Sequence, residues 1–297
     1  MQVAVFFALG GAILLALRDI FGRLAMRGID PVLGTAATAL VGQVLLAVIS
    51  AVNGDFTQPW PAWGLPLLNI ALAGILRITI ARTLLFTAIK HTGAARASSL
   101  AATNVFFAIL LARLFLEETL TLPLVLGSTL IVLGCVLIAR SHAKAISPET
   151  TRHYIKGVSL ALTSALAFGS SSVFARPVIT SFASPIQANF YANAFALLSY
   201  LPLLRGRPLR DEVGTWSSRT WGMIAIVGLV VSVGTTCAYF ALTYAPVVFV
   251  QPIFQSRPLF VVAISWLFFQ IHEQVTWKVV TGAAIIVGGT VLLIQSY

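Results

Sequence analysis

The chain has 297 residues, of which 58% are hydrophobic and only 9% are charged, and its mean hydropathy is +0.94. Soluble domains carry about 25% charged residues, so this composition excludes an ordinary soluble fold. The net charge of +10 would suit nucleic acid only if the basic residues formed a patch on a soluble face, and most of them border apolar runs instead. We expect the lipid bilayer as a partner, and no nucleic acid.

Apolar stretches follow one another along almost the whole sequence, each close to the roughly 20 residues that a helix needs to cross a bilayer. Strands of a β-barrel would alternate apolar and polar residues, and these runs do not. The first run lacks a preceding basic segment, so we expect a helix there and not a cleaved signal. We predict an all-α integral membrane protein with ten transmembrane helices, at 3–27, 32–52, 63–89, 95–116, 122–139, 155–176, 186–204, 220–244, 247–270 and 277–295.

The sequence contains an internal repeat. The segment ALGGAILLALRDIFGRLA from Ala8 aligns with ALTSALAFGSSSVFARPV from Ala161, a shift of 153 residues, which also aligns Ala88 with Ala241. Two residues are gained near Ile271 and His272, so beyond the fourth helix of each half the shift is 155, which pairs Glu118 with Glu273, Thr121 with Thr276, Gly127 with Gly282 and Gly134 with Gly289. We therefore divide the chain into a first five-helix repeat (1–140), a basic linker loop (141–154) and a second five-helix repeat (155–297).

Five helices per half is an odd number, so the second repeat enters the membrane from the opposite side. The loops agree with this inversion: 53–62 has no Lys or Arg and its counterpart 205–219 has four Arg, whereas 90–96 has Lys90 and Arg96 and its counterpart near 245–246 has neither. Cytoplasmic loops collect Lys and Arg, so we expect the basic connections in the cytoplasm and both termini outside it. Inverted repeats around a midplane site are typical of secondary transporters.

Two stretches carry a resemblance to a known family. They are LFLEETLTLPLVLGSTLIVLG, from Leu114 to Gly134, and LFFQIHEQVTWKVVTGAAIIVGG, from Leu267 to Gly289. Each resembles the Leu-Phe-x-x-Glu-x-x-Thr pattern and the glycines seven apart of the EamA-domain branch of the drug/metabolite transporter superfamily. The resemblance covers the whole chain and implies alternating-access transport in a bacterial-type inner membrane, often of amino acids or related metabolites. It does not fix the substrate.

The sequence departs from the family pattern in the fourth helix. A proline is expected there, and the first half has Asn104 in its place, whereas the second half keeps Pro258. Asn104 is therefore a candidate residue of the cavity lining. The alternative is that its presence only removes the kink that a proline would give this helix.

Ionisable residues near the centre of a span are candidates for function, because an Arg there costs about 2.5–3.5 kcal/mol on insertion scales. Arg77, Arg257 and Arg18 lie near the middle of their spans, and Asp19 is the only acidic residue well inside one. The surplus of positive charge favours an anionic substrate group such as a carboxylate. The alternative is that Arg77 and Arg257 bind backbone carbonyls at helix bends.

Four further arginines are interpreted as structural, and Asp19 is interpreted separately. Arg82 lies closer to a span end, and Arg23, Arg113 and Arg176 are near enough to reach the interface, so we expect a structural role for all four. Asp19 is a candidate site for a coupling proton, although its Arg neighbours favour its ionised form.

The span 247–270 contains Pro246 just before it and Pro252 and Pro258 within it, so we expect this helix to be bent or broken. Irregular backbone at membrane depth is tolerated where protein or water satisfies it, which makes Gln251 and Gln255 candidate cavity residues. Kinks that only shape packing are the alternative.

Further polar side chains form a stripe in span 186–204, where Asn189 and Asn193 are one helical turn apart and Tyr200 shares their face. They are interpreted either as substrate ligands or as interhelical hydrogen bonds. Tyr239 is a candidate aromatic wall, with simple packing as the alternative.

Several sequence features favour structural roles. Glu118 and Glu273 are expected to complement the N-terminal dipoles of the fifth and tenth helices, with Thr121 and Thr276 as N-caps. The glycine pairs Gly127/Gly134 and Gly282/Gly289 favour either close helix packing or the seam of a homodimer. Cys135 and Cys237 are expected to be core residues.

The sequence favours a secondary transporter of a small polar metabolite, an amino acid or related carboxylate, with export preferred. The alternatives are a carrier of cationic or lipophilic drugs, or a non-transporting receptor or assembly subunit. An enzyme is not expected, because the histidines lie at connections and no H-E-x-x-H or G-x-S-x-G motif occurs. No Walker A pattern occurs either, and we expect no cofactor and no metal site.

Overall fold

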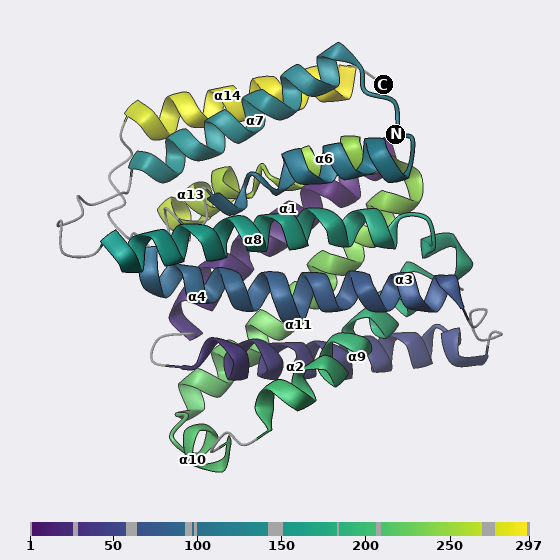
Figure 1. Ribbon diagram of the computed structural model, residues 1–297, viewed down its shortest axis with the longest axis vertical. Coiled ribbons are helices and arrows are strands. Elements are labelled where there is room, and N and C mark those ends of the chain that lie inside the picture. Colours follow the sequence, from purple (N-terminus) through teal and green to yellow (C-terminus); the bar gives the residue numbers. More distant parts are fainter. Residues whose placement is uncertain are drawn as a thin grey trace.

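The computed structural model describes residues 2–25, 29–57, 64–92, 97, 100–141, 151–182, 184–205, 209–268 and 277–295, and the regular elements in these ranges are all helices (Figure 1). The first half holds α1 (Gln2–Ala25), α2 (Pro31–Val52), α3 (Leu65–Gly74), η2 (Ile75–Arg82), α4 (Thr83–Thr92), α6 (Asn104–Phe115) and α7 (Leu122–Ser141). The second half holds α8 (Thr151–Ala175), α9 (Pro185–Leu204), α10 (Leu209–Gly214), α11 (Ser218–Tyr244), α12 (Val247–Phe254), α13 (Arg257–Phe268) and α14 (Trp277–Gln295).

Some of the sequence predictions fall on parts of the chain that the structure does not describe. Glu273, Thr276 and residues 142–150 of the predicted linker lie outside the described residues, as do the side chains of Arg23 and Pro258.

Five stretches are long and apolar enough to cross a bilayer as single helices: Gln2–Gly22, Pro31–Val52, Leu65–Thr92, Ile155–Ala175 and Ser218–Tyr244. Shorter apolar helices cover Asn104–Phe115, Leu122–Leu137, Val247–Val261 and Val280–Gln295. Large apolar side chains such as Phe6 and Val52 are exposed, as expected for a surface that faces lipid. The chain is thus a multi-pass membrane protein, and the total of ten crossing helices stays a prediction.

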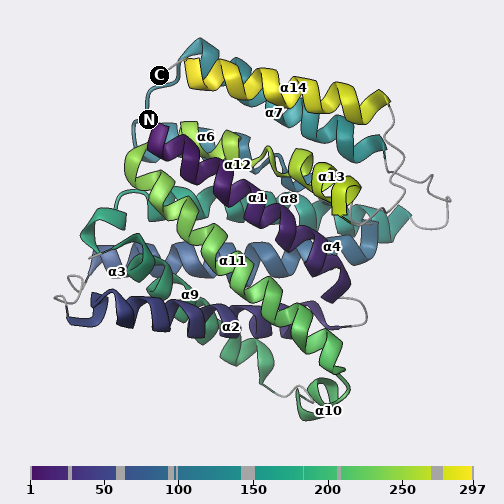
Figure 2. The ribbon, with the colours of Figure 1, turned by 180° about the vertical axis from the view of Figure 1, so that it is seen from behind.

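The two ends of the helical bundle differ in charge. The chain termini lie together at one end, and the C-termini of α1, α4 and α9 and the start of α8 and α11 lie at the other (Figures 1 and 2). Among the described residues, Lys90, Lys156, Arg205 and Arg219 lie at this second end, whereas Glu117 and Glu118 follow α6 at the end with the termini. Lys and Arg are thus more frequent at the second end, although Arg113 and Arg176 lie at the end with the termini. Which side faces the cytoplasm stays a prediction.

The two halves are joined by the pair of helices that close them, α7 and α14, which lie side by side (Figure 2). A Cβ on Gly127 would lie 2.8 Å from the carbonyl O of Gly289, and one on Gly134 would lie 2.6 Å from that of Gly282. The contacts run up one helix and down the other, so these equivalent helices are antiparallel, as inverted repeats require. Close packing by the glycines is confirmed, and it occurs within one chain.

The predicted break in the ninth span is confirmed, because α12 and α13 are separated at Gln255–Ser256. The fourth span turns at the equivalent residues 102–103, just before α6, although no proline stands there. Gln255 Nε2 donates to the carbonyl O of Ala102 at 3.3 Å and to Asn104 Oδ1 at 2.5 Å. Cys135 Sγ donates to the carbonyl O of Gln255 at 2.9 Å. Side chains thus satisfy backbone groups that lipid could not.

Glu118 stabilises a helix N-terminus, but in a different helix from the one that the sequence suggested. Its two carboxylate oxygens accept hydrogen bonds from the backbone N of Val247 and Val248, at 2.9 and 3.0 Å. These amides belong to the first turn of α12, where no intrahelical acceptor exists and negative charge complements the helix dipole. The connection between α6 and α7 of the first repeat therefore holds the broken helix of the second repeat in place.

The glycine contacts between α7 and α14 predict a specific loss of stability. In Gly134→Ala the new methyl group would overlap the backbone of Gly282, which should destabilise the protein by about 1–3 kcal/mol and lower its melting temperature in detergent. Gly10→Ala is the matched control, because a Cβ at Gly10 meets nothing within 4 Å. Equal melting temperatures for the two variants would contradict this packing.

The role of Glu118 can be tested with its neighbour as control. Glu118→Gln keeps the shape of the side chain but removes its charge and one of the two acceptor oxygens that the N–H groups of Val247 and Val248 use. We therefore expect the free energy of unfolding to fall by about 1–3 kcal/mol in thermal unfolding. Glu117 is exposed, and Glu117→Gln should melt like the unmodified protein. A similar small effect from both variants would show that Glu118 does not hold α12.

Candidate functional site

A polar cavity lies within the bundle, between α1, η2, α8, α11 and the broken helix α12–α13. Its volume is about 50 Å³, enough for a few water molecules. The polar side chains that line it come from both halves of the chain: Arg18, Arg77, Arg82, Asn104, Ser172, Thr235, Gln251, Gln255 and Arg257.

A second cavity of about 60 Å³ adjoins the first. Four residues line both cavities, namely Arg18, Arg82, Gln255 and Arg257. The remainder of the second lining is Asp19 and apolar residues of α4 and of the segment before α6: Leu85, Phe86, Ile89, Ala101 and Ala102. Arginine side chains thus stand between the two cavities, and we call the two adjoining cavities together the cavity path.

The π-helical segment η2 explains why two arginines face this path. A π-helix bonds residues five apart, so Arg77 and Arg82 lie roughly above one another. In an α-helix residues five apart point about 140° away from each other. Arg82 was expected to have a structural role because it lies closer to a span end, but its side chain is only 4% exposed and lines both cavities.

Arg77 is held by neutral groups of two neighbouring helices. Its Nε donates to Ser171 Oγ at 3.4 Å and its Nη2 to Ser172 Oγ at 3.2 Å, and its guanidinium carbon lies 5.6 Å from the ring centre of Tyr239. Gln251 also donates to Ser172. Tyr239 thus forms an aromatic contact with Arg77, and none of the partners named here brings a negative charge.

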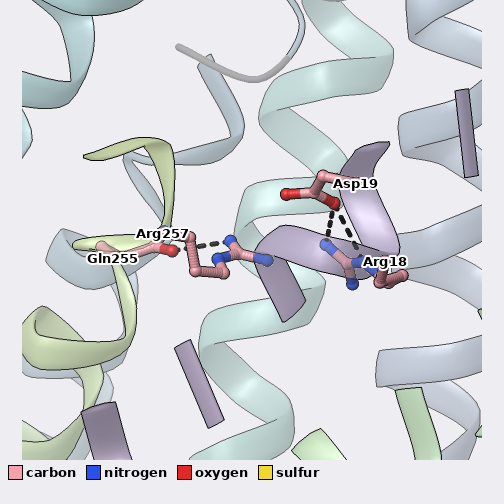
Figure 3. Close-up of polar contacts among 4 residues, drawn as sticks. All are labelled: Arg18, Asp19, Gln255 and Arg257. Atoms are coloured by element: carbon pink, nitrogen blue, oxygen red, sulfur yellow. Dashed lines mark hydrogen bonds and ion pairs between the residues drawn. The ribbon is translucent and has the colours of Figure 1, made fainter. Parts of the chain in front are cut away.

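Arg18 and Arg257 approach the cavity from opposite sides (Figure 3). Arg18 Nε and Nη2 donate to Asp19 Oδ1 at 2.9 and 2.5 Å. Arg257 Nη2 donates to Gln255 Oε1 at 2.7 Å, so Gln255 joins Arg257 to Asn104 and to the break in the fourth span. Asp19 thus forms an ion pair with Arg18 and its charge also acts on Arg257, whose hydrogen-bond partner Gln255 is neutral. The coupling role of Asp19 stays a prediction.

Arg82 differs from the other three arginines. No hydrogen bond from its side chain to another described residue is present, and its buried Nε has no partner. The charges of Arg18 and Arg77 both act on Arg82, and like charges repel strongly away from water. A buried donor without an acceptor is costly, so an acceptor placed in the adjoining cavities would stabilise this side chain.

The asparagines of α9 lie away from the cavity. Asn189 Nδ2 donates to the carbonyl O of Ser232 and to Thr236 Oγ1, and Asn193 Nδ2 to the carbonyl O of Ala39 and to Gln43 Oε1. These bonds join α9 to α11 and α2. They are the interhelical hydrogen bonds expected as the alternative to substrate contact. Their predicted contact with substrate stays a prediction, whereas Arg18, Arg77, Asn104, Gln251, Gln255 and Arg257 are brought together.

The chain belongs to the EamA-like transporter family, whose model matches residues 2–140 and 155–295, one match in each repeat. It is similar to a protein of Clostridium kluyveri named "Uncharacterized transporter", with 25% identity over 297 residues, 98% of this chain and 93% of the relative. The structure is also similar to a crystal structure of a protein that is 18% identical to this chain, with a TM-score of 0.79. The similarity covers 100% of this chain and 98% of the solved chain, and it supports the fold. Family and relative point to a transporter, not to an enzyme.

The contrast between Arg82 and Arg77 predicts opposite effects on stability. Arg82→Met removes a buried charge without a hydrogen-bond partner in the described structure, so the melting temperature in substrate-free detergent should stay the same or rise. Arg77→Met removes contacts to two serines and Tyr239 and should destabilise by about 1–3 kcal/mol. A larger loss for Arg82→Met than for Arg77→Met would contradict the geometry described for these two side chains.

Proposed function

We propose that the protein is a secondary transporter that carries a small polar metabolite, an amino acid or related carboxylate, across the inner membrane by alternating access, with export preferred. The observation that carries the proposal is a cavity path with four arginine side chains and one acidic side chain, Asp19, among its described lining residues. Guanidinium groups bind carboxylates through paired hydrogen bonds. An anionic substrate would supply the charge that the lining lacks.

The relation between the two cavities supports alternating access. A shift of 153 residues converts Leu85, Ile89, Ala101 and Ala102 of the second cavity into Ala238, Leu242, Phe254 and Gln255 of the first. Each cavity is thus built in part from the equivalent surface of the opposite repeat. If the repeats exchange conformations, one cavity widens as the other narrows, and the substrate passes between them.

A carrier of cationic or lipophilic drugs is less well supported. A cation in this path would face an excess of positive charge at low dielectric. The ring of Tyr239, which could otherwise bind a cation, already contacts Arg77. The cavity therefore favours an anion.

Transport by the full chain in liposomes tests the proposal. Counterflow of labelled alanine, succinate and tetraphenylphosphonium would be compared, with protein-free liposomes as the blank. We expect saturable counterflow of at least one carboxylate. Arg77→Gln and Arg257→Gln should lower that flux by about tenfold or more, as expected for the loss of a charged hydrogen bond of about 1.5–3 kcal/mol, whereas Arg219→Gln, at the exposed start of α11, should transport normally.

Two outcomes would contradict the proposal. Movement of tetraphenylphosphonium alone would identify a cation carrier. No movement of any solute, from protein that melts cooperatively, would favour a receptor or assembly subunit.

A further inference from the structure

The charge along the cavity path exceeds what one carboxylate neutralises. The described lining has four arginines and one acid, Asp19, which forms an ion pair with Arg18 and whose charge also acts on Arg257. Three positive charges therefore remain in excess, and the hydrogen-bond partners of Arg77 and Arg257 among the described residues are neutral. The arginine charges also act on one another across the path. A single carboxylate would leave two of the three excess charges uncompensated away from water.

The unmatched arginines lie at two places along the path. Arg77 lies at the first cavity only, beside Ser171, Ser172 and Gln251, whereas Arg82 and Arg257 lie where the two cavities meet. Arg77 and Arg82 are five residues apart on one face of η2, a rise along the helix of at most about 7.5 Å. This separation suits two negative groups at the ends of a short molecule better than one doubly charged group.

From this arrangement we infer that the substrate is a small dicarboxylate, which deepens the proposed function and rests on it. One carboxylate binds Arg77 and the hydroxyl group of Ser172, which both line the first cavity. The other binds Arg82 and Arg257 at the junction of the cavities, where the Arg82 side chain has no hydrogen-bond partner among the described residues. Arg82 is then the residue that selects for the second charge.

The size of the path limits the length of the molecule. The two cavities measure about 50 and 60 Å³, which together hold only a few water-sized groups. A chain of a few carbon atoms between the carboxylates is therefore expected, and the flanking apolar residues Leu15, Leu85 and Phe86 offer no partner for further polar groups.

The experiment compares succinate with succinamate, in which one carboxylate is replaced by an amide of nearly the same shape. Counterflow would be measured with the full chain in liposomes, together with malonate, glutarate and alanine. We expect a preference for a dicarboxylate over succinamate of about tenfold or more, the scale of one charged hydrogen bond. Arg82→Gln should reduce this preference by about tenfold, because the lost charge acts on the second carboxylate only.

Controls separate the possible failures. Arg82→Lys keeps the charge and should retain most of the preference, and Arg219→Gln should retain all of it. Transport of alanine or succinamate as fast as of every dicarboxylate would overturn this inference and leave the proposed function intact. The absence of counterflow for all carboxylates would overturn both, and a preference for dicarboxylates that Arg82→Gln does not change would show that Arg82 does not read the second charge.

Discussion

The burial of several guanidinium groups at bilayer depth is the constraint on which the rest of this structure depends. Each such group costs about 2.5–3.5 kcal/mol to place in a membrane. Either the surrounding residues must therefore supply hydrogen-bond partners, or a bound anion must supply the opposite charge. The helices around the path give neutral partners to Arg77 and Arg257, and Asp19 pairs with Arg18. The broken helices α12–α13 and the turn before α6 make room for these groups, with their freed backbone atoms bound by Gln255 and Cys135.

The helices of the two repeats are arranged as an inverted repeat, but the charged residues along the path are not repeated. Arg18 is equivalent to Ser171, Arg82 to Thr235 and Arg257 to Asn104, each pair differing by 153 in number. In each pair the arginine lines the path and its counterpart is neutral. Thr235 and Asn104 also line the path, and Ser171 accepts a hydrogen bond from Arg77. The repeats can therefore exchange shapes while the positive charge stays with the same residues. Charge placement, and not the shape of the fold, then determines which solute is carried.

Much of this arrangement follows from the sequence, and the exceptions have physical causes. The apolar runs, the repeat and the three prolines indicate the helices, the two halves and a bend or break in the ninth span, because each is a local or periodic signal. Arg82 could not be recognised, because its direction depends on the π-helical winding of η2, and a sequence read with α-helical geometry turns it away from Arg77. The contact of Glu118 with α12 joins residues 129 apart in sequence, and no local pattern signals it.

The central claim, that the path is built for an anion of two charges, is tested most directly by ligand-induced thermal stabilisation of the purified protein. Succinate and its dimethyl ester would be compared at matched ionic strength, since a ligand that binds only the folded state raises the melting temperature with concentration. We expect a saturable rise with the dicarboxylate and none with the ester, and in Arg82→Gln the rise should require about tenfold more succinate. An equal rise with the uncharged ester would contradict this claim.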